Sequence, residues 1–404
     1  MVFASKRGLG FLVMNAVEFN NVPLILSVIF LLFGFADERQ RDAPASGAAI
    51  EPALATDANF DPMNNEMITE EEIMNDLVPL TIACGDYDRT RALSDGRVSV
   101  EGCRVNFLPL EPEEVFFRSF RNQEFDVAEL SFSSYCIATA RGDSAYIGIP
   151  AFVSRCFRHS GIYVRKDAGI KTPQDLRGKR IGVPEYQLTA LVWIRGMLQE
   201  EFGVKPSEST WFGGGQEEPG RDERTPIKMP SDVKLTAIPH DKTLVQMLLA
   251  GELDALFTAR APSCYENGHP NVDRLFPNYR EVEKAYWSKT GLFPIMHLIG
   301  IKKDLVVRHP WLPASVYKAF LSARNFAYKE AREVAALHVT LPWVEAEARE
   351  TVKLMGKDYW PYGVKESARD IEAMTSYSFV QGLASKKLTP ADLFAPGTLE
   401  ISKI

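Results

Sequence analysis

The segment SRCFRHSGIYVR, residues 154–165, places two arginines and a histidine inside a stretch that otherwise has the composition of a buried strand. Charged side chains are costly to bury without partners. The planar fork of an arginine binds carboxylates, and an imidazole transfers protons near neutral pH. We therefore expect Arg155 or Arg158 to hold a carboxylate and His159 to transfer or position a proton.

The division of roles among these three residues depends on the local backbone. In a regular strand, Arg155 and His159 share one face and Arg158 points away, which would make Arg158 the structural residue. A bulge at Cys156 or Phe157 would reverse that assignment. The alternative for both arginines is a salt bridge to an aspartate or glutamate across the hinge.

Further polar side chains follow two other predicted strands, at the end where parallel sheets bind ligands. Asp86 and Arg89 follow the apolar run VPLTIAC, and Tyr186 and Gln187 follow a strand predicted over 179–183. All four are predicted to bind the ligand. The alternative for Asp86 is to cap the helix that comes directly after it.

The sequence ELSFSSY places Glu129 at the end of a third strand and Ser131, Ser133 and Ser134 at the start of a helix. Free N–H groups at a helix N-terminus and serine hydroxyls both suit an anion. The alternative is ordinary capping, which uses only one serine. Glu129 is predicted to orient a histidine or an arginine, and the alternative is a buried ion pair.

Two later residues complete the candidate set. Arg260 lies where the chain returns to its first half, and it is predicted to be a second carboxylate clamp or else a hinge salt bridge. His297 lies within the apolar strand FPIMHLIGI, where a histidine is either a satisfied core residue or a proton-transfer group. The sequence leaves open which of His159 and His297 is the acid.

Strands alternate with helices from residue 79 onward, which favours βαβ units and a parallel sheet. A break near 165–170 and a return near 260 predict an α/β fold of two lobes with a ligand cleft between them. We assign residues 79–168 and 259–404, including C-terminal helices, to lobe 1 and residues 169–258 to lobe 2. The length of 404 residues also suits more than one compact unit.

Several long motifs, in one order along the chain, resemble a single family. The sequence is similar to 4,5-dihydroxyphthalate decarboxylases over about residues 79–385, and the stretch from Thr172 to Phe257 resembles the second lobe of the type II periplasmic-binding-protein fold. The motifs that carry the family resemblance are ACGDYDRTRALSDGRV (83–98), ELSFSSY (129–135), SRCFRHSGIYVR (154–165), DLRGKRIGVPEYQLTALVWIRGML (175–198) and WFGGGQEEPGR (211–221).

The resemblance implies a carboxy-lyase that converts 4,5-dihydroxyphthalate, a small aromatic dicarboxylate, to protocatechuate and CO₂ without a cofactor. Such a reaction needs a proton donor over a ring carbon, a polar partner at the phenol oxygen and cations at the carboxylate that stays. The family match strengthens the assignment of His297 to the site. The alternatives are a non-catalytic solute-binding protein for a small carboxylate and a decarboxylase of another phenolic acid.

The bulk composition argues against other classes of protein. A net charge of −7 with no long basic run argues against a nucleic-acid partner. The five cysteines and six histidines show no metal-binding spacing, so no metal site is predicted. An odd number of scattered cysteines fits reduced thiols in the cytoplasm. Exposed C-terminal helices are compatible with a homo-oligomer.

Residues 1–78 are predicted to lie outside the fold. Lys6 and Arg7 precede the apolar run VPLILSVIFLLFGFA at 22–36, which has the length of a signal-peptide core and is short for a membrane span. This segment is a targeting signal, a membrane anchor or an extension without function. We expect a cytoplasmic protein; the alternative is the secretory pathway or a membrane reached through residues 22–36.

Overall fold

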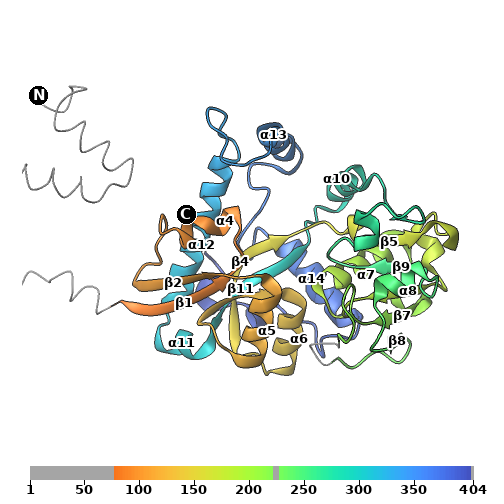
Figure 1. The fold of residues 1–404 in the computed structure, drawn as a ribbon. Coiled ribbons are helices and arrows are strands. Elements are labelled where there is room, and N and C mark those ends of the chain that lie inside the picture. Colours follow the sequence, from red (N-terminus) through yellow and green to blue (C-terminus); the bar gives the residue numbers. More distant parts are fainter. Residues whose placement is uncertain (1–76, 222–226, 402–404) are drawn as a thin grey trace, which may run out of the picture. The chain divides into compact units, whose positions relative to one another are not determined.

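The computed structural model describes residues 77–221 and 227–401. The apolar run at 22–36, and nearly all of the extension predicted over residues 1–78, therefore lie outside the described residues. The described part contains two β-sheets with helices packed against them (Figure 1).

The first sheet has five strands in the order β2, β1, β3, β11, β4. β1 runs parallel to β2 and β3, whereas β11 runs antiparallel to both β3 and β4. The sheet is mixed, because the returning chain inserts β11 between two earlier strands. The strands are β1 Val78–Cys84, β2 Cys103–Pro109, β3 Val127–Ser131, β4 Tyr146–Arg155 and β11 Ile295–Lys302.

The second sheet has six strands in the order β10, β5, β9, β6, β7, β8. Its central strands are parallel, and β5 runs antiparallel to β9 and β10. The strands are β5 Ile162–Arg165, β6 Arg180–Val183, β7 Thr210–Gly213, β8 Lys234–Ala237, β9 Ala255–Phe257 and β10 Val272–Arg274.

The sheets correct the lobe boundaries drawn at residues 168/169 and 258/259. β5 and β10 both pair within the second sheet, so the chain crosses to it before residue 162 and returns after residue 274. The segment 154–165 is not one strand. β4 ends at Arg155, and a short 3₁₀ turn, His159–Gly161, precedes β5.

Helices occupy the connections between strands and the C-terminal region. They are α4 Asp88–Ser94, α5 Pro112–Asn122, α6 Phe132–Arg141, α7 Thr189–Phe202, α8 Leu244–Leu249, α9 Ser263–Glu266, α10 Tyr279–Thr290, α11 Lys303–Arg308, α12 Leu312–Glu330, α13 Val344–Met355, α14 Ala368–Val380 and α15 Pro390–Leu393.

Local sequence signals account for several helix ends. Pro112 lies in the first turn of α5 together with acidic residues, as favoured at a helix N-terminus. α6 ends at Arg141 and is followed by the C-cap residue Gly142, whose φ of 83° suits glycine. α12 ends at Glu330. The segment that follows contains Pro342 and no sustained apolar face.

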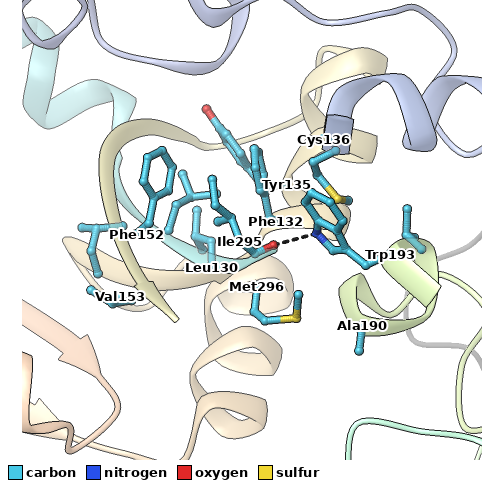
Figure 2. Packing of buried hydrophobic residues seen from close by; sticks show 14 of the residues in the cluster. Leu130, Phe132, Tyr135, Cys136, Phe152, Val153, Ala190, Trp193, Ile295 and Met296 are labelled. Carbon is cyan, nitrogen blue, oxygen red and sulfur yellow. Dashed lines mark hydrogen bonds between the residues drawn. The ribbon is translucent and has the colours of Figure 1, made fainter. Parts of the chain in front are cut away.

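The two lobes contact each other through α7 as well as through the chain crossings. The Trp193 side chain on α7 packs among first-lobe residues, and its indole N–H donates a 2.9 Å hydrogen bond to the carbonyl of Ile295 (Figure 2). Ala190 and Met296 lie near this contact. The start of α7 is therefore fixed against the strand that carries His297.

The described residues include neither a disulfide nor a cluster of metal-binding side chains. All five cysteines fall within it and are free thiols. Among its residues, no group of three or more His, Cys, Asp or Glu side chains is arranged to hold a metal ion. None of its helices is both long and apolar enough to cross a bilayer.

Candidate active site

A cleft of about 630 Å³ lies where the first-lobe strands end and the second lobe begins. The first lobe contributes the loop after β1, the start of α5 and the start of β11. The second lobe contributes the start of α7 and the loop after β9. The lining residues are Gly85, Asp86, Tyr87, Pro109, Leu110, Glu111, Pro112, Glu113, Glu114, Phe116, Ser131, Arg158, Leu188, Thr189, Ala190, Ala259, Arg260, Met296 and His297.

Glu129 and His297 form a close pair at this cleft. The imidazole Nδ1 lies 2.6 Å from Glu129 Oε1. The carboxylate is completely buried, whereas 19% of the His297 side chain is exposed. Nδ1 is therefore occupied by the carboxylate, and Nε2 is the ring nitrogen left to reach a ligand. The edge of the Phe116 ring contacts the imidazole, with the ring centres 4.8 Å apart.

Strand pairing explains why these two side chains meet. β11 pairs antiparallel with β3 so that His297 lies opposite Ser131 and Ile299 lies opposite Glu129. Directly opposed residues, and residues two apart on one strand, project from the same face of a sheet. Glu129, Ser131 and His297 therefore share a face. The pairing of β11 with β4 is irregular on both sides of His297.

Three more groups surround the Glu129 carboxylate. The Tyr87 hydroxyl donates to Oε1 at 2.8 Å, and the Gly85 N–H donates to Oε2 at 2.8 Å. The Cys84 thiol contacts Oε2 at 3.3 Å. Burial opposes ionisation, but the hydrogen bond and charge of His297, with the bonds from Gly85 and Tyr87, lower the pKa of Glu129. The carboxylate is thus an anion held for the imidazole.

Two arginines line the cleft. Arg158 Nε contacts the Met296 sulfur at 3.2 Å, and Arg158 Nη1 donates to the carbonyl of Ala259 at 3.3 Å. Arg260 is 68% exposed and lies 3.8 Å from carboxylate oxygens of Glu111 and Glu113. Most of the hydrogen-bonding capacity of both guanidinium groups remains available for the carboxylate of a ligand.

The predicted roles of Arg155 and Arg158 are reversed. Arg155 ends β4 with its guanidinium buried, where it donates to Asp370 and Ser367, each at 2.7 Å, and to the carbonyls of Phe293 and Pro361. It is a structural residue and does not line the cleft. The strand stops at Arg155, so regular alternation does not extend to the residues after it.

His159 also lies away from the cleft, contrary to its assignment as a catalytic residue. Its ring is buried between Phe276 and Tyr286, with ring centres 5.4 and 5.1 Å away. Its Nδ1 is 3.8 Å from Glu283 Oε1, too far for a hydrogen bond. Burial lowers the pKa of His159 to about 4. Burial likewise raises the pKa of Glu283 to about 7.

The loop after β1 places its two candidates differently. Asp86 is exposed at the edge of the cleft, 3.9 Å from Arg91. It does not cap α4, because Tyr87 is the N-cap residue. Arg89 lies behind Tyr87, with its guanidinium carbon 4.1 Å from the centre of that ring and its Nε bonded to the carbonyl of Val153. Arg89 therefore supports the site without lining it.

The three serines divide between the cleft and its surroundings. The Ser131 hydroxyl lines the cleft and lies 3.1 Å from Thr189 Oγ1, which also accepts from the Ser133 N–H. The Ser133 hydroxyl is buried with no hydrogen-bond partner among the described residues. The Ser134 hydroxyl donates to Gln187 at 3.0 Å. Only Ser131 reaches the cleft directly.

The two second-lobe candidates do not line the cleft. Gln187 donates to Glu185 at 2.9 Å and lines a neighbouring cavity of about 520 Å³, which shares Phe116 and Ser131 with the cleft. Tyr186 is fully buried beneath Arg195, whose guanidinium carbon lies 3.6 Å from the centre of the tyrosine ring. Tyr186 is a core residue of the second lobe.

Sequence reasoning missed Tyr87, Phe116 and Met296 as cleft residues. Tyr87 lies in the motif ACGDYDR, from which only the charged residues Asp86 and Arg89 were predicted to bind the ligand. Phe116 and Met296 belong to apolar patterns that are typical of any core. Only the position of Tyr87 directly after a strand end, between two chemical candidates, gave a usable signal.

The chain is similar in part to a family model and to solved structures. The model of the periplasmic substrate-binding protein of phosphonate ABC transporters matches residues 97–261. The aliphatic sulphonate binding protein SsuA of Escherichia coli aligns at 12% identity and a TM-score of 0.44, covering 80% of this chain and 99% of that one. The desulfurization enzyme DSZB aligns at 15% identity and a TM-score of 0.42, covering 80% and 97%. The family model agrees with the predicted periplasmic-binding-protein-like fold, and the two described sheets with their packed helices confirm its α/β class.

Two curated relatives are much more similar in sequence. The 4,5-dihydroxyphthalate decarboxylase of Comamonas testosteroni is 46% identical over 325 residues, which span 80% of this chain and 98% of the relative. That of Pseudomonas putida is 52% identical over 210 residues, which span 52% of this chain and 81% of the relative. The chain belongs to the 4,5-dihydroxyphthalate decarboxylase family.

Proposed function

We propose that this protein is a carboxy-lyase that converts 4,5-dihydroxyphthalate to protocatechuate and CO₂. Two relatives of that name support the reaction. The observation that carries the proposal within the molecule is the Glu129–His297 pair, at 2.6 Å, in a cleft lined by two arginines. A proton donor and carboxylate-binding cations are what the reaction requires.

The substrate itself sets the order of events. Each of its two carboxylates lies para to a hydroxyl group, and the molecule is symmetric, so either carboxylate is equivalent as the leaving group. Electrons from the para hydroxyl make the ring carbon under that carboxylate basic. Protonation of this carbon breaks aromaticity, and loss of CO₂ restores it. The enzyme must therefore deliver one proton to a carbon atom.

His297 is the proton donor in this proposal. Its Nδ1–H donates to Glu129, which fixes the tautomer and the orientation of the ring. The proton on Nε2 then faces the ligand space. Positioned acids of this kind contribute about 10²- to 10⁴-fold to rates. In this step Glu129 acts through the imidazole, which it positions.

Arg158 and Arg260 bind the carboxylate that stays. Both line the cleft, and both offer a planar fork to an anion. The leaving carboxylate is best left without a cation, because ion pairing would stabilise the ground state more than the departing neutral CO₂. Met296 and Leu188 give part of the lining an apolar character that suits this loss of charge.

A solute-binding role on the same fold would need the arginines only. A buried carboxylate clamped on a cleft-facing histidine adds nothing to simple capture of an anion, and it is this pair that favours an enzyme. A decarboxylase of another phenolic acid would use the same groups. The substrate assay distinguishes these possibilities.

The test is turnover by the full-length protein. We expect protocatechuate and CO₂ to appear in equal amounts from 4,5-dihydroxyphthalate, with the rate unchanged by EDTA. Saturable binding without product would identify a solute-binding protein. Turnover of protocatechuate itself, which lacks the second carboxylate, would contradict the role given to the two arginines.

A cytoplasmic location is also proposed. The five free cysteines, none of them in a disulfide, support a reducing compartment. Fractionation of cells that produce the full-length chain tests this directly. Recovery in the membrane or the secreted fraction would favour the alternative reached through residues 22–36.

A further inference from the structure

Tyr87 and His297 both line the cleft, and both bond to the same oxygen of Glu129. The Tyr87 hydroxyl donates to Oε1 at 2.8 Å, and His297 Nδ1 lies 2.6 Å from that atom. One buried carboxylate oxygen therefore joins two groups that face the ligand space. The proton donor explains one of these groups, and the tyrosine has no role in the steps described above.

We propose that Tyr87 is a catalytic residue that receives the proton of the substrate hydroxyl para to the leaving carboxylate and passes its own proton to Glu129. This inference rests on the proposed decarboxylase function. The directions of the hydrogen bonds suit it. Tyr87 already donates its O–H to Glu129, so its oxygen lone pairs are free to accept from a phenol O–H that enters the cleft.

The proton balance closes over one turnover. His297 gives the Nε2 proton to the ring carbon, the substrate hydroxyl gives its proton to Tyr87, and Tyr87 gives its own to Glu129. The substrate ring is then an uncharged dienone, and both carboxylates are still attached to it. The C–C bond to one carboxylate breaks, its electrons restore the ring, CO₂ leaves, and the phenolate takes its proton back through Tyr87. Solvent returns one proton to His297.

The surroundings of Tyr87 hold it in the position that this relay needs. The Arg89 guanidinium carbon lies 4.1 Å from the centre of the tyrosine ring and 4.4 Å from that of Trp360. A Cβ atom at Gly85 would come within 2.4 Å of the ring, so only glycine leaves room there. The Tyr87 ring is therefore held between the Arg89 guanidinium and the backbone of Gly85.

The electrostatics favour a neutral relay over a tyrosinate. Burial and the neighbouring Glu129 carboxylate raise the pKa of Tyr87 far above its ordinary value. The hydroxyl therefore stays protonated at neutral pH and exchanges one proton for another, with no charge left on its own oxygen. The Cys84 thiol, whose pKa burial and Glu129 also raise, contacts the other carboxylate oxygen and does not line the cleft.

The test compares Tyr87→Phe with the wild type in the full-length protein from pH 7 to 10. At pH 7 we expect kcat to fall about 100-fold and KM to change less than about threefold, as for loss of a proton-transfer group. The ratio of wild-type to variant activity should shrink toward about pH 10, the ordinary pKa of a phenol, because the substrate hydroxyl then ionises without help.

Cys84→Ala is the matched control, since it also removes a Glu129 contact but faces no ligand. Its loss should be small and the same at every pH. Thermal unfolding of each variant verifies the fold. A Tyr87→Phe loss that is independent of pH would overturn the relay and leave Tyr87 as a positioning residue. Wild-type protein that releases no CO₂ would overturn the proposed function and the relay together.

Discussion

Two histidine–glutamate pairs in this molecule behave in opposite ways. His297 and Glu129 lie 2.6 Å apart, and Glu129 accepts further hydrogen bonds, which hold its pKa low. His159 and Glu283 lie 3.8 Å apart with no hydrogen bond between them. Burial lowers the pKa of that histidine to about 4 and raises that of that glutamate to about 7. The Glu129 carboxyl group is therefore held as an anion, whereas burial favours the neutral forms of both His159 and Glu283.

The difference lies in the partners of the two carboxyl groups: Glu129 is bonded by the His297 imidazole and the Tyr87 hydroxyl as well as by a backbone N–H, whereas Glu283 is bonded only by the backbone of His159 and Ser160. Both glutamates are largely removed from water, which raises a carboxyl pKa unless hydrogen bonds and nearby positive charge offset it. Glu129 accepts hydrogen bonds from Tyr87, Gly85 and His297 at normal distances. His159 instead faces the rings of Phe276 and Tyr286. A catalytic pair needs this support as well as a cleft.

The largest effect should come from comparing two single variants in which one or the other histidine is replaced by glutamine. His297→Gln removes the proton donor, so we expect kcat to fall about 10³-fold with little change in KM. His159→Gln, the matched control, should keep kcat within about threefold, because the ring lies outside the cleft. Steady-state kinetics at pH 7 measure both. A large loss of kcat in folded His159→Gln would remove the distinction between the pairs.

A third buried pair extends the comparison to a structural site. The side chains of Arg155 and Asp370 are hydrogen-bonded to each other at 2.7 Å, unlike those of His159 and Glu283, yet they lie outside the cleft. Arg155→Gln leaves Asp370 buried without a cation, which should lower the free energy of unfolding by about 3 kcal/mol. KM of the remaining folded protein should not change. Denaturant unfolding and KM together check this, and a raised KM with normal stability would contradict it.

The neutral pair should show itself in the pH dependence of stability. The lowered pKa of His159 gives stability that is present above 6.5 and lost as the pH falls toward 4. The raised pKa of Glu283 gives stability that is present below 4.5 and lost as the pH rises toward 7. In the wild type these two dependences of stability on pH oppose each other between pH 4.5 and 7. The charges of Arg158 and Arg274 lie near Glu283 and limit the rise of its pKa.

Single substitutions should expose one slope at a time. Relative to the wild type, Glu283→Gln should gain about 2 kcal/mol of unfolding free energy between pH 4.5 and 7, because only the histidine slope remains. His159→Gln should lose about as much over the same range. Urea unfolding at both pH values measures this. Equal slopes in both variants would show that the pair is not neutral in the folded protein.

Most of the fold could be predicted because it rests on periodicity and strand-end signals. The alternation of strands and helices predicted two α/β lobes correctly. The lobe boundaries were misplaced, because β5 and β10 are strands of four and three residues whose sheet depends on distant partners. Short strands carry too little pattern to show which sheet they join.

The site was predicted in part, for a physical reason that differs between residues. Glu129 and His297 meet at the cleft, and Arg158 and Arg260 line it. Arg155 and Arg158 were exchanged because alternation fails where β4 stops. The roles of His159 and His297 depend on partners far away in sequence. No spacing rule distinguishes a histidine facing Glu129 from one facing two aromatic rings.

The smallest of these effects concerns Arg158, the sequence neighbour of His159 that faces the cleft. Arg158→Gln removes one fork from the carboxylate that stays, so KM should rise about 10-fold while kcat changes little, since Arg260 remains. Arg158→Lys should recover only part of this affinity, because an ammonium group lacks the planar fork. Stability should be nearly unchanged, because the guanidinium makes only two hydrogen-bond contacts, to the Met296 sulfur at 3.2 Å and to the Ala259 carbonyl at 3.3 Å. If Arg158→Gln instead behaved like His159→Gln, with normal KM and altered stability, residues 158 and 159 would belong to one structural cluster, and Arg260 alone would bind the substrate.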